Sequence, residues 1–275
     1  MTSVVVWRDR EDFGFGDCPG SLILQDVRIA ADSLISNPGR TGGQHILTGA
    51  AAKIIPIPIK LFAGYESGPG YHPVYDGQIG FAYAGSTFAA TMTHALAASC
   101  LTTLCGYVDA PLPTMADLAR FIARIGSRYI IDSASRFEAC LVGADCDRRG
   151  LTDTRCFHLS YSDADRAMTV TEIDLDPSGS FLLLGDRKDE VGALIRAGFE
   201  GDPTFQPSRA IAQIIADAGI AEIGGALQLA SARRGGFRLL PTWGYSAATQ
   251  SFPNLIGLND DEGLGGVGDY WIGDP

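Results

Sequence analysis

Basic residues, cysteine and long apolar runs are all scarce in this sequence. Lys and Arg together number 21 against 32 Asp and Glu, so the formal net charge at pH 7 is −11. An acidic surface repels phosphate backbones, which argues against binding to nucleic acid. No apolar run approaches the roughly 18 residues that a membrane-spanning helix requires. We therefore expect neither a nucleic acid nor a membrane as a partner.

Cysteine and histidine are also too few and too scattered to form a recognisable metal site. The six cysteines are sparse for a secreted disulfide scaffold, and no two of them have CxxC spacing. The four histidines show no HExxH or other metal-ligand spacing, so we expect no metal and no cofactor. The first residues, MTSVVVWRDRED, lack the basic start and longer apolar region of a signal peptide. These features predict a reducing, cytoplasmic location.

The chain nevertheless has the composition of a folded domain with a sizeable core. It has 275 residues, of which 46% are hydrophobic and 19% charged. Apolar, β-branched or alternating runs predict strands at residues 2–7, 21–32, 52–62, 79–83, 137–142, 156–161, 167–175, 181–184, 226–230 and 237–240. Helical composition or amphipathic spacing predicts helices at residues 88–104, 115–131, 190–199 and 208–217. Composition predicts loops at residues 37–43 and 64–77.

The order of these elements predicts the fold class. Two consecutive pairs of helices flanked by antiparallel strands indicate an α+β fold in which antiparallel sheets lie between helix layers. No internal repeat or linker precedes Pro241, so residues 1–240 are expected to form one domain. Residues 241–275 are rich in Gly, Asn and Asp, which predicts an irregular C-terminal arm.

Thr2 is the candidate nucleophile. It is small enough for the initiator Met to be removed in the cell, and a chain that begins at Thr2 carries a hydroxyl and a free α-amine on one residue. The α-amine has a pKa near ~8, so it can act as a general base at neutral pH. The simpler alternative is that a Met-Thr start has no chemical meaning. A nucleophile at Cys18 is a further alternative, and it requires cleavage after Asp17.

Four short segments occur in an order that resembles a known family. They are TSVVV at residues 2–6, IAADS at 29–33, KIIPI at 53–57 and FAYAGST at 81–87. Together they resemble proteasome β-type subunits, which are N-terminal nucleophile (Ntn) hydrolases, and the related bacterial proteasome-like peptidases. The resemblance covers residues 2–240 loosely, and its specificity lies in the first 90 residues.

This resemblance implies a fold, a reaction and a set of site residues. The fold is a four-layer αββα sandwich, and the reaction is hydrolysis of peptide amide bonds through an acyl-enzyme on Thr2. Lys53 supplies a positive charge beside the hydroxyl, and Asp32 holds Lys53 in place. The backbone N–H of Gly85, next to Ser86, stabilises the oxyanion or binds substrate. The resemblance also implies self-association into a ring or helical stack, with an ATPase as a possible partner.

The sequence departs from this family pattern in three places. Thr2 and Asp32 are 30 residues apart, which implies an insertion near residues 9–22. Gly185 is followed by Asp186 and Arg187 where the pattern has Ser, and residues 220–225 (IAEIGG) lack the expected Asp and Ser. Two rival functions therefore stay open. One is a non-catalytic assembly or binding subunit, and the other is a small-molecule amidase or acyltransferase.

Overall fold

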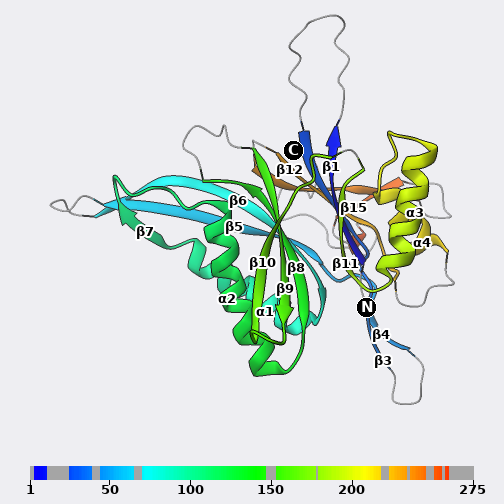
Figure 1. Cartoon of the computed structure of the whole chain (residues 1–275), viewed down its shortest axis with the longest axis horizontal. Coiled ribbons are helices and arrows are strands. Elements are labelled where there is room, and N and C mark those ends of the chain that lie inside the picture. The colour runs from blue at the N-terminus through cyan, green and yellow to red at the C-terminus, as the bar shows by residue number, and fades with distance from the viewer. Residues whose placement is uncertain are drawn as a thin grey trace, which may run out of the picture.

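The computed structural model of the chain describes residues 3–10, 25–38, 44–64, 70–146, 153–177, 179–217, 223–233, 236–245, 251–255 and 258–259. Two large sheets and four helices make up most of these ranges (Figure 1). None of the helices in the described ranges is long and apolar enough to cross a membrane.

The first large sheet has five antiparallel strands in the order β11-β1-β2-β12-β13. The strands are β1 (Ser3–Arg10), β2 (Gln25–Ala31), β11 (Phe181–Gly185), β12 (Gln228–Arg233) and β13 (Gly236–Leu240). Side chains on β1 alternate between two apolar environments: Val4 and Val6 face the second sheet, while Val5 and Trp7 face two helices. Burial of both faces explains why residues 4–7 of this strand are an unbroken apolar run.

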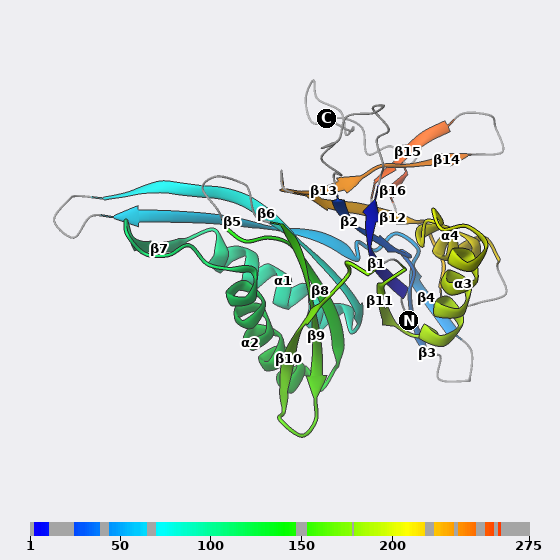
Figure 2. The ribbon, with the colours of Figure 1, turned by 45° about the horizontal axis from the view of Figure 1, so that its top comes forward.

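The second large sheet has six strands in the order β10-β9-β8-β6-β5-β7. The strands are β5 (Ile54–Gly64), β6 (Tyr71–Gly85), β7 (Leu104–Tyr107), β8 (Phe137–Ala144), β9 (Thr154–Ser162) and β10 (Ala167–Ile173). All neighbours are antiparallel except β5 and β7, which are parallel. Figures 1 and 2 show that β5 and β6 extend together as a long ribbon beyond the helices.

Two smaller sheets lie at the edges of this framework. A hairpin joins β3 (Ile35–Pro38) and β4 (Gln44–Thr48), and a three-stranded sheet contains β14 (Thr242–Tyr245), β15 (Ser251–Leu255) and β16 (Leu258–Asn259).

The four helices form two pairs on opposite sides of the sheets (Figure 1). They are α1 (Thr87–Leu101), α2 (Met115–Ser133), α3 (Lys188–Gly201) and α4 (Ser208–Ala216). Thr114 and Asp117 form a reciprocal capping box that begins α2, because each side chain accepts a hydrogen bond from the other residue's backbone N–H. Ser86 begins α1 in a similar way by accepting from the N–H of Ala89.

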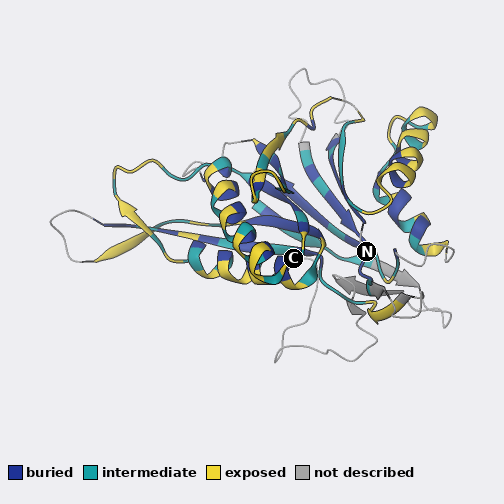
Figure 3. Cartoon of the chain, turned by 60° about the horizontal axis from the view of Figure 1, so that its bottom comes forward, coloured by how far each residue is buried: buried dark blue, intermediate teal, exposed yellow. Residues whose placement is uncertain are grey.

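Three apolar clusters hold the elements together, and Figure 3 shows buried residues along the central strands and on the helix faces that cover them. The first cluster packs α1 and α2 against the six-stranded sheet, with Phe81 and Ile122 among its members. The second lies between the two large sheets and includes Val6 and Cys140. The third packs α3 and α4 against the five-stranded sheet and includes Trp7. The α+β class is confirmed by this arrangement.

Several sequence-based boundaries differ from the structure. Residues 71–77 were expected in a loop, but they belong to β6, because their backbone pairs with β5 as far as Gly64 and Tyr71. The helix expected at 88–104 ends at Leu101, since the next residues form β7 beside β5. Residues 37–38 of the loop expected at 37–43 belong to β3, and parts of the expected irregular arm form β14, β15 and β16. Backbone pairing overrides local composition in each case.

Candidate functional site

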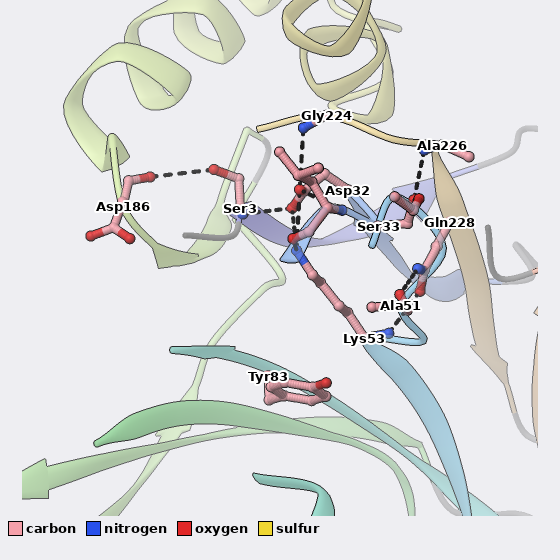
Figure 4. Close-up of polar contacts among 12 residues, drawn as sticks. Ser3, Asp32, Ser33, Ala51, Lys53, Tyr83, Asp186, Gly224, Ala226 and Gln228 are labelled. Carbon is pink, nitrogen blue, oxygen red and sulfur yellow. Dashed lines mark hydrogen bonds and ion pairs between the residues drawn. The ribbon is translucent and has the colours of Figure 1, made fainter. Parts of the chain in front are cut away.

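Asp32 and Lys53 form a buried ion pair that joins the two large sheets (Figure 4). Asp32 directly follows β2, and Lys53 directly precedes β5. Lys53 Nζ lies 3.1 Å from both carboxylate oxygens of Asp32. The exposed fractions of the two side chains are 1% for Lys53 and 0% for Asp32. The fold therefore brings together two residues that lie 21 positions apart in the chain.

Three backbone N–H groups also bind the Asp32 carboxylate. Ser3 N donates to Oδ1 at 2.9 Å, while Leu34 N and Gly224 N donate to Oδ2 at 3.2 and 3.3 Å. A buried carboxylate is costly unless it is both paired and hydrogen-bonded, and Asp32 meets both conditions. One side chain therefore fixes the start of β1, the turn after β2 and the segment before β12.

The Lys53 ammonium group is in an unusual electrostatic environment. Its third hydrogen bond goes to the carbonyl oxygen of Leu34. Burial lowers the pKa of Lys53 below its usual value, and the attraction of Asp32 opposes this effect without cancelling it. Lys53 therefore gives up its proton more readily than an exposed lysine.

Side chains from both sheets hold the backbone around Lys53 (Figure 4). Gln228 on β12 accepts hydrogen bonds from the N–H groups of Lys53, at 3.0 Å, and of the next residue, at 3.3 Å; its amide group donates to the Ala51 carbonyl. From β6, the Tyr83 hydroxyl donates to the Ala52 carbonyl at 3.2 Å. These contacts restrict the backbone from which the Lys53 side chain extends.

The turn after Asp32 packs closely against the segment that precedes β12. The Ser33 hydroxyl donates to the Gly49 carbonyl and accepts from the N–H of Ala226 at 2.6 Å. Gly225 has φ of +76°, and a Cβ at this position would overlap the Gly49 carbonyl and the Ser33 hydroxyl. Only glycine satisfies both the backbone angle and the close approach.

Gly85 and Ser86, the predicted oxyanion or substrate-binding residues, lie where β6 meets α1. Gly85 is exposed and has φ of +101°, and a Cβ there would lie 2.7 Å from the Arg136 carbonyl oxygen. Ser86 N donates to the same carbonyl at 2.8 Å. The Tyr83 N–H, two residues before Gly85, donates to the Lys53 carbonyl at 3.2 Å. Ser86 therefore caps α1 with its side chain and binds the residue before β8 with its backbone N–H.

Thr2 and Cys18, the two candidate nucleophiles, lie outside the described residues. Ser3 is the first residue that the structure describes, and its hydroxyl donates to the Asp186 carbonyl at 3.3 Å. Asp186 is one of the residues at which the sequence departs from the family pattern. The backbone of this turn, and not the Asp186 side chain, therefore contacts the start of β1.

The third departure from the family pattern lies partly outside the described residues. Residues 220–222 are not described, whereas Ile223 is buried in the cluster around α3 and α4. Gly224 binds Asp32 through its N–H, and its carbonyl accepts from Ser33 N at 3.2 Å. The segment therefore supports Asp32 through its backbone, without the side chains that the pattern expects.

The sequence did not single out Gln228 or Ser33. Gln228 is the one polar side chain among Gln228, Ala230 and Ala232, which share a face of β12. A polar residue at such a position is a signal, but its partners Ala51 and Lys53 lie 175 or more positions away. Ser33 follows Asp32 directly, and nothing in its spacing indicates its contact with Gly49.

The described residues contain no group of three or more His, Cys, Asp or Glu side chains arranged to hold a metal ion. Cys100, Cys105, Cys140, Cys146 and Cys156 are all free thiols.

Comparison with known proteins places the fold. No protein-family model and no characterised protein matches the sequence. Among solved structures, the chain is similar to the Anbu (Gly-1) mutant from Hyphomicrobium sp. strain MC1, with 14% identity and a TM-score of 0.53, over 87% of this chain and 85% of that one. It is also similar to Anbu (ancestral beta-subunit) from Yersinia bercovieri, with 13% identity and a TM-score of 0.51, over 86% of each chain.

This similarity corrects the family that the sequence indicated. The assignment to proteasome β-type subunits is wrong, because the structural neighbours are Anbu proteins. The four motifs behind that assignment lie within residues 2–87 and describe local strands and turns. They do not discriminate between related families. The chain shares its fold with proteins of the Anbu group.

Proposed function

We propose that this chain is an N-terminal threonine hydrolase with an Anbu-like fold, which cleaves peptide amide bonds through Thr2. The buried Asp32–Lys53 pair carries the proposal. Its carboxylate binds Ser3 N, which is the nitrogen of the peptide bond to Thr2. A fully buried lysine with a lowered pKa, whose carboxylate partner binds the residue after a candidate nucleophile, is typical of a functional site.

The layering of the fold supports the same proposal. Helices α1 and α2 cover the six-stranded sheet, α3 and α4 cover the five-stranded sheet, and an apolar cluster lies between the sheets. We infer that this is the αββα sandwich of the Ntn hydrolases. Under that assignment the nucleophile lies at one end of the sandwich, where β1 begins.

The proposed reaction follows from the groups present. Removal of Met1 leaves Thr2 with a free α-amine, which accepts the hydroxyl proton as the oxygen attacks the substrate carbonyl carbon. The C–N bond then breaks, the proton moves to the leaving amine, and the acyl group stays on Thr2. Water attacks the ester by the same route in reverse, which releases the acid and restores the hydroxyl.

Lys53, Asp32 and Gly85 have separate roles in this scheme. The Lys53 charge stabilises the alkoxide-like nucleophile, and Asp32 fixes its position. The Gly85 N–H donates to the oxyanion, and loss of such a donor costs about 10²–10³ in rate. Gly85 is exposed at the end of β6, where a substrate can reach it.

Self-association into a ring or helical stack belongs to the proposal, with an ATPase as a further possible partner. Phe88, Met92 and Leu96 lie one turn apart on α1, and their exposed fractions are 61%, 37% and 39%. An apolar stripe of this kind supports contact with a second copy of the chain. Sedimentation velocity at micromolar concentration checks this, and a monomer would contradict it.

Two measurements test the catalytic proposal. Intact mass shows whether Thr2 is the first residue. Covalent labelling by an electrophilic peptide, read by mass on the N-terminal peptide, then shows whether Thr2 is nucleophilic. Labelling should occur in the wild type and vanish in Thr2→Ala, which keeps the α-amine and loses only the hydroxyl. Absence of labelling in wild type with a free Thr2, or equal labelling in the variant, would contradict the proposal.

One observation favours the rival, a non-catalytic assembly or binding subunit. An ammonium group has three N–H donors, and Lys53 already faces two Asp32 oxygens and the Leu34 carbonyl. Lys53 then acts on Thr2 through its charge alone, or it serves only to join the sheets. The labelling experiment distinguishes the two functions.

A further inference from the structure

Glu138, on β8, is the centre of a second charged cluster between the two large sheets. Gly185 N donates to Oε1 at 2.7 Å, and His158 Nε2 lies 3.0 Å from Oε2. Lys188 Nζ lies 2.8 Å from Oε1 and 2.9 Å from Oε2. Glu138 and His158 belong to the six-stranded sheet, whereas Gly185 ends β11 and Lys188 begins α3. The carboxylate therefore connects the two halves of the molecule.

This cluster lies next to both halves of the proposed active site. In the β6–β8 ladder, Glu138 pairs with Ala84, and Phe137 pairs with Gly85. In the β1–β11 ladder, Ser3 pairs with Gly185. Glu138 thus directly follows Phe137, which pairs with the proposed oxyanion donor Gly85. Its carboxylate also binds Gly185 N, and Gly185 pairs with Ser3.

Glu138 holds the turn at residues 185–187, whose backbone has an uncommon conformation. Gly185 has φ of +96° and Arg187 has φ of +59°, so two of three successive residues lie in the left-handed region. Between them, the Asp186 carbonyl accepts from the Ser3 hydroxyl at 3.3 Å. A hydrogen bond to Gly185 N and an ion pair to Lys188 bracket this turn and hold it in place.

The charge on Glu138 is permanent at working pH. Burial raises its pKa, but hydrogen bonds from His158, Lys188 and Gly185 N outweigh burial and hold the pKa at about 2. Because an ionised carboxylate only accepts hydrogen bonds, the Nε2 of His158 carries its proton. Glu138 therefore stays an acceptor for His158, Lys188 and Gly185 N across the neutral range.

We propose that Glu138 is a positioning residue that sets the separation between the nucleophile and the oxyanion donor. This inference rests on the proposed function. Thr2 is attached to the five-stranded sheet through Ser3, whereas Gly85 belongs to the six-stranded sheet. Reaction needs both within close limits of the same substrate carbonyl, and a displacement of about 1 Å can cost 10²-fold in rate. Glu138 bonds the six-stranded sheet to the end of β11, beside the register partners of both points.

The test compares labelling kinetics at Thr2 in the wild type, Glu138→Ala, Glu138→Gln and Glu172→Gln. Glu138→Ala removes every contact and should slow the saturating first-order labelling rate by about 10²-fold, with little change in the half-saturating concentration. Glu138→Gln should lie between Ala and wild type, because its amide oxygen still accepts from Gly185 N. Glu172, on β10, pairs with Arg155 away from this cluster and serves as the matched control with an unchanged rate.

The possible outcomes separate this inference from the proposed function. A role in stability alone would lower the folded, labelled fraction and leave the first-order rate constant unchanged. Wild-type rates in both Glu138 variants would overturn the positioning role and leave the hydrolase intact. No labelling of a wild type with free Thr2 would overturn both. If Glu138→Ala does not fold, the comparison of Glu138→Gln with Glu172→Gln decides the question.

Discussion

Asp32 and Glu138 are both carboxylates that bridge the two sheets. At the two sites, however, burial and hydrogen bonding differ in which one dominates the pKa shift. The Asp32 side chain is fully buried and is paired with Lys53, whereas the Glu138 side chain is 21% exposed and is bonded to His158 and Lys188. At the first site burial wins and lowers the pKa of Lys53. At the second site hydrogen bonds win and lower the pKa of Glu138 to about 2.

The two sites therefore differ in how stable their charges are. In the Asp32–Lys53 pair, burial opposes the ammonium charge that the Asp32 carboxylate stabilises. The Glu138 cluster is a site where the charge does not change, as a fixed connection between two sheets requires. Mutations in the pair and mutations in the cluster should therefore lower the free energy of unfolding by different amounts and with different pH dependences.

The largest effect is expected from removing one member of the buried pair. Lys53→Met leaves the Asp32 carboxylate buried without a counter-charge, which should lower the free energy of unfolding by about 3–5 kcal/mol. The double variant Asp32→Asn, Lys53→Met removes both charges and should recover most of that loss. Urea unfolding measures both. A single variant within about 1 kcal/mol of wild type would show that the pair is not effectively buried.

A pH titration of stability should separate the Glu138 cluster from the pair. The folded-state pKa of Glu138 is about 2, below its ordinary value of 4.5, so its contribution is present above pH 4.5 and is lost as pH falls toward 2. Its size is about 3 kcal/mol, from about 1.36 kcal/mol per pKa unit. Unfolding of wild type and Glu138→Gln between pH 6 and 2 measures it. Parallel curves would contradict the assignment.

The backbone support of Asp32 can be tested with two glycines that both have positive φ. Gly225→Ala forces a Cβ against the Gly49 carbonyl and Ser33, next to the N–H that binds Asp32, whereas Gly236→Ala at φ of +114° meets open space. Both variants carry backbone strain of about 1–3 kcal/mol. Gly225→Ala should cost more in thermal or urea unfolding and should also slow labelling of Thr2. Equal effects at the two positions would count against a tight contact.

The smallest effect is expected from an ion pair that joins neighbouring strands at the surface. Arg155 and Glu172 form two hydrogen bonds between β9 and β10, but their side chains are 33% and 49% exposed. A double-mutant cycle with Arg155→Ala and Glu172→Ala should give a coupling free energy of about 0.2–1 kcal/mol. A coupling free energy as large as that of Asp32 and Lys53 would show that burial does not explain the difference between the two ion pairs.

Local patterns predicted much of the fold. The apolar run at β1 and the amphipathic spacing of α2 identified those elements, and the alternation of helix pairs with strands predicted the α+β class. The first half of β6 was missed because Gly, Pro and Tyr at residues 70–77 have loop composition. Its pairing with β5 is a long ribbon that composition does not reveal.

The site was predicted less completely than the fold. Asp32 and Lys53 were identified by resemblance, and the structure places them in contact, while their catalytic roles stay predictions. Gln228 and Glu138 were not identified, because their meaning depends on partners that lie 175 and 47 positions away. Glu138 did carry a signal, since it shares a strand face with Cys140 and Val142. A charged residue in such a position needs a partner from another segment.

The origin of the Asp32 and Lys53 contacts has a consequence for biosynthesis. Asp32 takes a hydrogen bond from Gly224, and the Lys53 backbone depends on Gln228, so the pair is completed only by residues near the end of the five-stranded sheet. Contacts across such long stretches of chain form late, because a large loop must close first. A ribosome-bound chain that stops before residue 224 lacks these supports. The buried ion pair therefore gains its full set of hydrogen bonds only after β12 has been synthesised and has paired with β2.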